Sequence, residues 1–227
     1  KEEVENLLAF LQNSKDRKEQ GLGDAMPLTY HLIFSGNPGT GKTTVARILA
    51  NIYRDLGIIA GGKLIEVTRS DLVVAEKGKT AERAAEKFNQ AIDNVLFIDE
   101  AYTLSKKKDP NDNGQEAIDE LLKFMEDYRD RLIVIVAGYE TNMKEFISSN
   151  AGLASRFKRN IVFENYNDLE LYQIFFKLCR DNPLQTAVTD GRRQAECTKT
   201  SVAFTLAQIS RPGAMPSSAT AAGVIAA

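Results

Sequence analysis

The sequence predicts an α/β fold organised around a parallel β-sheet. Segments with a strand pattern alternate along the chain with segments in which apolar residues recur every three or four positions. Two strand segments, 95–98 (VLFI) and 132–137 (LIVIVA), are wholly apolar, as expected for strands covered by helices on both faces. A glycine-rich turn joins the first strand to the helix that follows it. This alternation predicts parallel strands joined by right-handed crossovers.

Each element of this fold is predicted from its own pattern. The expected strands are residues 28–34, 63–68, 95–98, 132–137 and 160–163. Helices are expected wherever apolar side chains form a stripe along one face. The stripes run over residues 4–11, 45–56, 80–93, 118–125 and 168–180. Strand and helix patterns therefore continue as far as Arg180.

The last part of the chain has a different character. Beyond Arg180 the helical periodicity fades, and Ser, Thr, Ala and Gly accumulate, most clearly in residues 213–227. Such a composition is typical of low-complexity or poorly specified segments. The longest apolar runs of the whole chain are too short to cross a bilayer, so no membrane partner is expected.

Composition limits the classes of function. The 227 residues suffice for one substantial domain, or for one with a small companion. A formal net charge of −2, with no basic groove studded with aromatics, argues against a nucleic-acid partner. Cys179 and Cys197 lack metal or redox spacing, which predicts unpaired thiols and a cytoplasmic location. His31, the only histidine, lies in a strand pattern and is predicted to be structural.

A phosphate-binding loop follows the first strand. Residues 36–43 (GNPGTGKT) match G-x-x-x-x-G-K-[ST], with a strand before and a helix after. Glycines let backbone N–H groups turn inward toward phosphate, and the helix adds its positive end. Lys42 is predicted to reach the β- and γ-phosphates, and Thr43 to offer its hydroxyl to Mg²⁺. The residues predicted to bind the nucleotide are Gly36, Asn37, Pro38, Gly39, Thr40, Gly41, Lys42, Thr43 and Thr44.

Two carboxylates form the matching second motif. Asp99 and Glu100 end the segment 95–100 (VLFIDE), at the edge of the sheet where open α/β folds bind ligands. Asp99 is predicted to hold Mg²⁺, and Glu100 to orient the water that attacks the γ-phosphate. Adjacent residues of a strand point to opposite sides, so the two acids are expected to differ in orientation and in role. The acid pair favours hydrolysis, and the absence of N-K-x-D favours adenine.

Four segments together resemble the AAA+ ATPases, namely 31–47 (HLIFSGNPGTGKTTVAR), 96–104 (LFIDEAYTL), 135–143 (IVAGYETNM) and 152–157 (GLASRF). More narrowly, they resemble the branch that holds stage V sporulation protein K and the CbbX-like, red-type Rubisco activases. The resemblance implies a P-loop NTPase fold with a five-stranded parallel sheet. Strand 132–137 would lie between the phosphate-loop strand and strand 95–98. The implied domains are a large α/β domain over 1–165, and a partial helical lid with a low-complexity tail over 166–227.

The resemblance also implies roles for residues outside the two motifs. Tyr139 falls where the family has its first sensor residue, although a tyrosine packing at a strand end is the alternative. Arg156 falls where the family has an arginine finger that reaches the γ-phosphate of a neighbouring subunit. Arg159 is a second, weaker candidate, and a surface arginine is the alternative interpretation of Arg156. A finger acting in trans implies self-association into a ring, expected to be a hexamer.

The chain departs from the family pattern in two regions. Residues 71–83 (DLVVAEKGKTAER) lie where the central-pore loop is expected, but Glu76 and Lys77 stand where an aromatic would grip a threaded polypeptide. Residues 106–114 resemble either a second pore loop or a solvated loop. The second sensor arginine of the lid has no convincing match. Its loose candidates are Arg192, which follows Gly191, and Arg211.

The function predicted from these features is Mg²⁺-dependent ATP hydrolysis by a ring that remodels a protein client. One alternative is a nucleotide-gated assembly scaffold that does little mechanical work. The missing pore aromatic favours the scaffold, and the intact acid pair argues against it. A second alternative is a protein resembling a helicase loader, which the near-neutral charge disfavours.

Overall fold

The computed structural model describes residues 6–7, 9–13, 16, 20, 30–76, 78–105 and 113–181, with only the backbone for 179–181. The chain divides into two compact units, Lys1–Asp168 and Leu169–Ala227. Several sequence predictions fall outside the described residues, and the lid itself stays a prediction. The predictions outside the described residues concern Lys77, the lysines at 106–108, Gly191, Arg192, Cys197, Arg211 and the low-complexity tail.

The first unit is built on a five-stranded parallel sheet in the order β2-β3-β4-β1-β5. The strands are β1 (Leu32–Gly36), β2 (Leu64–Val67), β3 (Val95–Ile98), β4 (Ile133–Gly138) and β5 (Arg159–Phe163). Strand β4 therefore lies between β3 and the phosphate-loop strand β1, which confirms the order that the family resemblance implied.

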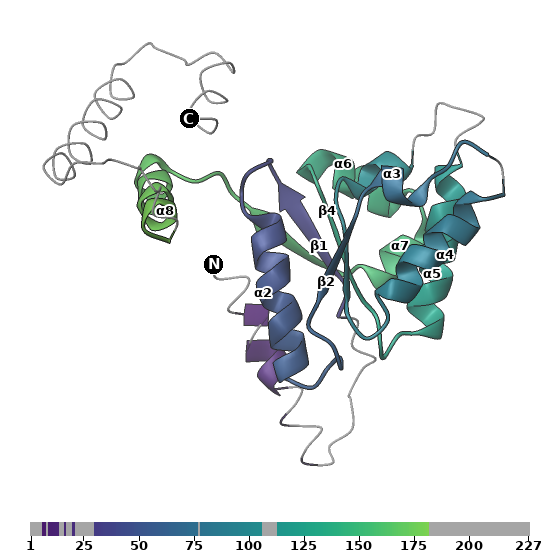
Figure 1. The fold of residues 1–227 in the computed structure, drawn as a ribbon, viewed down its shortest axis with the longest axis horizontal. Helices are drawn as coiled ribbons and strands as arrows, with labels where there is room; N and C mark the ends of the chain where they lie inside the picture. Colours follow the sequence, from purple (N-terminus) through teal and green to yellow (C-terminus); the bar gives the residue numbers. More distant parts are fainter. Residues whose placement is uncertain are drawn as a thin grey trace, which may run out of the picture. The chain divides into compact units, whose positions relative to one another are not determined.

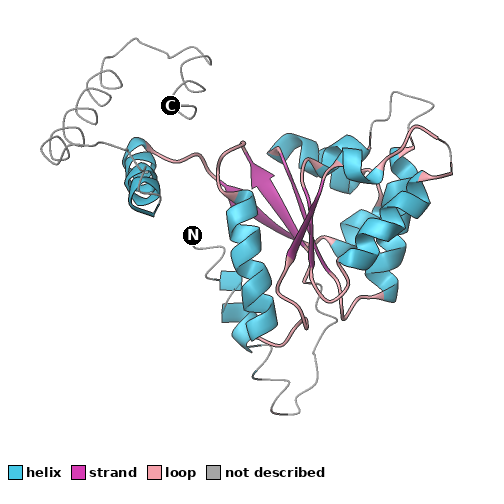
Figure 2. Cartoon of the chain, in the orientation of Figure 1, coloured by secondary structure: helices cyan, strands magenta, loops and turns pink. Residues whose placement is uncertain are grey.

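Helices cover both faces of this sheet, as Figure 2 shows. From residue 42 onward, the described helices of this unit are α2 (Lys42–Asp55), α3 (Arg69–Leu72), α4 (Thr80–Gln90), η1 (Ala101–Leu104), α5 (Gly114–Asp127), α6 (Glu140–Ser148) and α7 (Ala151–Arg156), and α8 (Asp168–Asp181) begins at the unit's last residue. Each apolar stripe from residue 45 to residue 180 lies on one of these helices. The short elements α3, η1, α6 and α7 were not predicted, because they are too brief or too weakly amphipathic to produce a stripe.

The apolar strands are explained by two hydrophobic clusters, one on each face of the sheet. Alternate residues of β3 enter different clusters, so that Leu96 packs with α4 and α5 while Phe97 packs with α2. Figure 1 shows α2 on one side of the sheet and α4 and α5 on the other. Leu7 and Leu11, from the predicted first helix, are buried in the α2 cluster. Because helices cover both faces of the sheet, the side chains on both sides of β3 and β4 are buried and apolar.

His31 is a structural residue, as predicted. Its imidazole is 5% exposed, and Nδ1 accepts a hydrogen bond of 3.0 Å from the backbone N–H of Val134. The ring lies 5.8 Å from that of Phe157, centroid to centroid. Burial, reinforced by the positive charge of Arg156, lowers the pKa of His31 from 6.5 to about 4.

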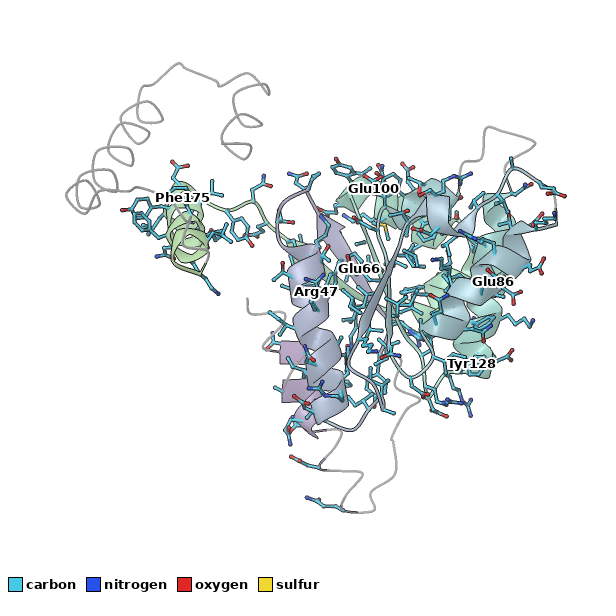
Figure 3. The ribbon with its side chains drawn as sticks, viewed as in Figure 1. Arg47, Glu66, Glu86, Glu100, Tyr128 and Phe175 are labelled. Carbon is cyan, nitrogen blue, oxygen red and sulfur yellow. The ribbon has the colours of Figure 1, made fainter. Side chains whose placement is uncertain are left out.

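Helix α8 contains all the described residues of the second unit, and it exposes many apolar side chains. Phe175, labelled in Figure 3, is 47% exposed, and Tyr172 packs on Phe176 with ring centroids 4.4 Å apart. Within the described part of the chain, no helix combines the length and apolarity needed to span a membrane.

Candidate functional site

A cavity of about 370 Å³ lies at the carboxyl ends of β1, β3 and β4. It is lined by all the residues of the predicted phosphate loop except Asn37 and Thr40. Asp99, Glu100, Gly138 and Tyr139 complete its walls, and Figure 3 labels Glu100 beyond the end of the sheet. The cavity therefore brings together two motifs that are about 60 residues apart in the sequence, at the edge of the sheet where such folds bind ligands.

The backbone of the loop explains its glycines. Gly39 and Gly41 have φ angles of 77° and 87°, in the left-handed region that side chains disfavour. Gly41 is also the N-cap of α2, and the first turn of that helix contains no acidic residue. The partial positive charge of the helix N-terminus is therefore not neutralised by its own helix and is available to an anion in the cavity.

Lys42 is the cation of the cavity. Its ammonium donates hydrogen bonds to the carbonyl oxygens of Gly36 (3.0 Å) and Asn37 (2.8 Å). Partial burial lowers the pKa of Lys42, while the charges of Asp99 and Glu100 oppose that shift. One lysine and two carboxylates thus line the same cavity.

Asp99 and Glu100 both face the cavity, so the expectation that they point to opposite sides of a strand is wrong. The physical reason is that β3 ends at Ile98, before either acid. Glu100 has φ 48° and ψ 43°, a left-handed conformation that turns the chain back on itself. Asp99 Oδ1 accepts a hydrogen bond from the Glu100 N–H (3.0 Å) and so holds the turn.

The turn at Glu100 is also anchored from its far side. The Thr103 hydroxyl donates to the Glu100 carbonyl at 2.7 Å, and Arg69 Nη1 donates to the Thr103 carbonyl at 2.5 Å. A non-glycine residue in the left-handed region is strained, and it persists only where its surroundings hold it. These two hydrogen bonds supply that support.

Tyr139 lines the cavity, and Tyr102 lies behind it, beside Gly138. Tyr139 caps α6 directly after β4, and its ring lies 6.2 Å from that of Tyr102. A Cβ atom at Gly138 would lie 2.7 Å from the Tyr102 ring, so glycine is needed for this close packing. Burial and the negative charge of Glu100 raise the pKa of Tyr102. Tyr102 belongs to no motif that predicts a role for it, although it lies only two residues after Glu100.

Asn37 and Thr40, the two loop residues that do not line the cavity, contact a segment that follows β5. Asn37 Nδ2 donates to Asn165 Oδ1 (2.9 Å), and the Tyr166 hydroxyl donates to the Thr40 carbonyl (3.0 Å). The Thr40 hydroxyl donates to the Asn37 carbonyl (2.8 Å). No sequence pattern pointed to Asn165 or Tyr166.

The oxygen donors of the cavity fit Mg²⁺. The Thr43 hydroxyl and the Asp99 carboxylate both line it, and hard oxygen ligands are those that Mg²⁺ prefers. Among the described residues, no group of three or more His, Cys, Asp or Glu side chains is placed to hold a metal. A sparse protein ligand set is usual for Mg²⁺, which takes its remaining ligands from water and from substrate phosphates.

The predicted arginine fingers lie outside the cavity. Arg156 Nη2 pairs with Glu126 at 2.7 Å, and its side chain is 25% exposed. Since α7 leads into the start of β5, Arg156 lies toward the edge where the strands begin, about 15 Å from the cavity by strand length. Arg159 contacts a residue of the same chain, and its guanidinium lies 3.7 Å from the centroid of the Phe10 ring.

The loop at 73–79 contains no aromatic residue. Glu76 is exposed and pairs with Lys79 at 2.8 Å, and Gly78 has φ 79°. The buried Asn113 side chain donates to the carbonyls of Val74 (2.9 Å) and Ala75 (3.3 Å). The loop is thus attached to the start of α5 and presents charged side chains.

Comparison with known proteins identifies the family. The model of the AAA family, the "ATPase family associated with various cellular activities", matches residues 32–165. Protein CbbX of Cereibacter sphaeroides is 43% identical over 185 residues, 82% of this chain and 60% of its own length. Protein CfxQ of Xanthobacter flavus is 44% identical over 181 residues, 80% of this chain and 57% of its own length.

A further relative is the ESX-1 secretion system protein EccA1 of Mycobacterium tuberculosis H37Rv. It is 44% identical over 176 residues, which are 77% of this chain and 30% of its own length. The chain thus spans between 30% and 60% of these curated relatives. The predicted resemblance to the CbbX-like branch is confirmed. The chain belongs to the AAA family of ATPases.

Proposed function

We propose that this chain binds ATP with Mg²⁺ and hydrolyses it within a ring of identical copies, and that the ring remodels a protein client. The observation that carries the proposal is the single cavity that holds the phosphate loop, Lys42 and two carboxylates. Family membership supports the same reaction. A cytoplasmic location and a hexameric ring belong to the proposal as well.

Each residue of the cavity has a proposed task. The inward N–H groups of the loop and the Lys42 ammonium bind the phosphates. Thr43 and Asp99 would hold Mg²⁺, which when bound neutralises charge on the phosphate oxygens. The Glu100 carboxylate accepts a hydrogen bond from the attacking water and takes its proton as the bond from the γ-phosphorus to the bridging oxygen breaks. Tyr139 contributes a polar hydroxyl to the wall beside Glu100.

Arg156 is proposed to act on a neighbouring copy. Its distance from the cavity of its own chain rules out a role there, whereas a finger supplied in trans explains why the fold assembles. Such a head-to-tail arrangement repeats the same contact around a closed ring.

Replacing Glu100 with Gln tests the hydrolytic role. We expect the E100Q variant to bind ATP as the wild type does, in calorimetric titration, because glutamine keeps the size and polarity of the side chain. Turnover should fall by roughly 10²- to 10⁴-fold, since the general base is lost. E86Q, an exposed change on α4 outside the cavity, is the matched control. Turnover by E100Q at the wild-type rate would contradict the role of Glu100.

Mixing two inactive variants tests the trans role. R156A alone should lose roughly 10³-fold in turnover, and E100Q alone is inactive for the reason above. In an equal mixture, roughly a quarter of the sites combine an intact Glu100 with a neighbour's Arg156, so that fraction of the wild-type turnover should return. A mixture as inactive as its components would refute the trans assignment.

A scaffold function is the second candidate, and the 73–79 loop favours it. Its exposed Glu76 and Lys79 are charged, whereas a ring that threads a polypeptide needs an apolar or aromatic side chain there to contact it. The two functions differ in their response to a client. A permanently unfolded polypeptide such as casein should stimulate ATP hydrolysis by a remodelling ring, and it should leave the rate of a scaffold unchanged.

A further inference from the structure

We propose that Asn165 and Tyr166 are positioning residues that hold the phosphate loop from its outer side. Through them, nucleotide binding is coupled to the segment that leads into the second unit. This inference rests on the proposed function in one respect, namely that the cavity binds ATP or ADP. It adds a route by which the rest of the chain senses the bound nucleotide.

The contacts form a small closed set. Asn165 accepts a hydrogen bond from the Asn37 side chain at 2.9 Å, and Tyr166 donates to the Thr40 carbonyl at 3.0 Å. The Thr40 hydroxyl, bonded to the Asn37 carbonyl at 2.8 Å, ties the two attachment points together. Asn37 and Thr40 are the only members of the predicted phosphate loop that do not line the cavity. The loop thus has an inner side for the ligand and an outer side for this segment.

Residues 163–166, here called the brace, lie against the loop too closely to move independently of it. Strand pairing sets Phe163 opposite Gly36, where an added Cβ atom would lie 2.4 Å from the Phe163 carbonyl oxygen. A Cβ atom at Gly41 would lie 2.9 Å from the Tyr166 hydroxyl. The brace backbone therefore requires glycine at position 36, and the lack of a side chain at Gly41 leaves room for the Tyr166 hydroxyl.

The coupling follows from the geometry of one peptide group. The Thr40 carbonyl and the Gly41 N–H belong to the same planar unit, so they cannot rotate separately. Tyr166 holds the carbonyl, while Gly41 lines the cavity in which phosphates are expected. A phosphate that draws the Gly41 N–H toward itself must turn the carbonyl held by Tyr166. Only Asn167 separates the brace from Asp168, the last residue of the first unit.

The first test measures what the hydroxyl of Tyr166 contributes. The Y166F variant should bind ADP about fivefold more weakly in calorimetric titration, the effect of losing about one net hydrogen bond. KM for ATP should rise by a similar factor with kcat little changed, because the hydroxyl touches no reacting atom. Y172F, which removes a hydroxyl from α8, is the matched control and should bind as the wild type does. A Y166F variant with wild-type affinity would overturn the positioning role.

A double-mutant cycle tests the other contact. N37A and N165A should each weaken ADP binding, and the double variant should be no weaker than the worse single variant, because both changes remove the same hydrogen bond. Fully additive losses would show that the two asparagines act separately, and would overturn their part in the brace.

The second measurement addresses the coupling itself, by hydrogen exchange of backbone amides with and without saturating ADP. In the wild type, ADP should slow exchange both in residues 36–44 and in residues 163–168. In Y166F at saturating ADP, the loop should still be protected while the change at 163–168 is lost. If the wild type binds ADP and 163–168 do not respond, the coupling is refuted and the proposed function stands. If the wild type binds neither ADP nor ATP, the coupling and the proposed function are both refuted.

Discussion

Acidification is expected to destabilise the first unit in part through one buried side chain, His31. The imidazole is buried, and its Nδ1 accepts the N–H of Val134, so the folded chain favours the neutral ring. With Arg156 adding repulsion, its pKa falls to about 4 in the folded state, against 6.5 ordinarily. Because the folded pKa is depressed, unfolded chains bind more protons between these values. The stabilisation is therefore complete above pH 6.5 and is lost as the pH falls toward 4.

The size of the effect follows from the shift. A change from 6.5 to about 4 corresponds to about 3 kcal/mol of unfolding free energy. Urea unfolding at a series of pH values between 7.5 and 4 measures it, with H31Q as the reference because glutamine offers an acceptor but does not titrate. Subtracting the H31Q curve cancels the carboxylates common to both proteins. The difference in unfolding free energy between wild type and variant should shrink by about 3 kcal/mol on acidification.

Parallel curves for wild type and H31Q would refute this reasoning. They would mean that the imidazole is protonated equally in the folded and unfolded chains. The hydrogen bond to Val134 would then have to be replaced by another arrangement, because a doubly protonated ring has no acceptor nitrogen.

Two further predictions concern the phosphate loop. The K42M variant should bind ATP roughly 10- to 100-fold more weakly in calorimetric titration, because its charge-assisted hydrogen bonds to phosphate are lost. The control variant K123M, on the exposed face of α5, should bind ATP as the wild type does. Equal affinities for K42M and the wild type would show that Lys42 does not bind the nucleotide. G36A should destabilise the protein by about 1–3 kcal/mol in urea, because the new methyl overlaps the Phe163 carbonyl. An unchanged unfolding midpoint would show that the loop tolerates a shift there.

The sheet could be predicted because its central strands are apolar on both faces, a pattern contained within each strand. The phosphate loop could be predicted for a similar reason, since glycine, lysine and threonine at fixed spacing encode both the backbone conformation and the chemistry. Helix α7 could not be predicted from the sequence, because six residues are too few to show a helical repeat of apolar side chains. It is held instead by the Asn150 side chain, which accepts from the N–H groups of Gly152 and Leu153.

The outer side of the loop was beyond sequence analysis for a different reason. Asn165 lies 128 positions from Asn37, and neither residue belongs to a pattern that predicts the other. The motif match therefore grouped Asn37 and Thr40 with the ligand-facing residues. Similarly, the direction of Glu100 depends on where β3 ends and on the anchor from Thr103. Spacing identifies which residues take part in chemistry, and tertiary contacts decide which way they face.

The ion pair of Arg156 bears on the proposed trans role, because an arginine finger must leave its own chain's partner to reach a neighbour. The side chain of Glu126 is 64% exposed but that of Arg156 only 25%, so the pair is partly buried, and a hydrogen bond between charged groups of this kind contributes about 1.5–3 kcal/mol. A finger that accelerates hydrolysis by roughly 10³-fold stabilises the transition state by about 4 kcal/mol. Because this stabilisation exceeds the energy of the ion pair, the contact with Glu126 does not prevent Arg156 from acting on a neighbouring site. It holds the guanidinium toward the edge where the strands begin, away from the cavity of its own chain, as the proposed trans role requires.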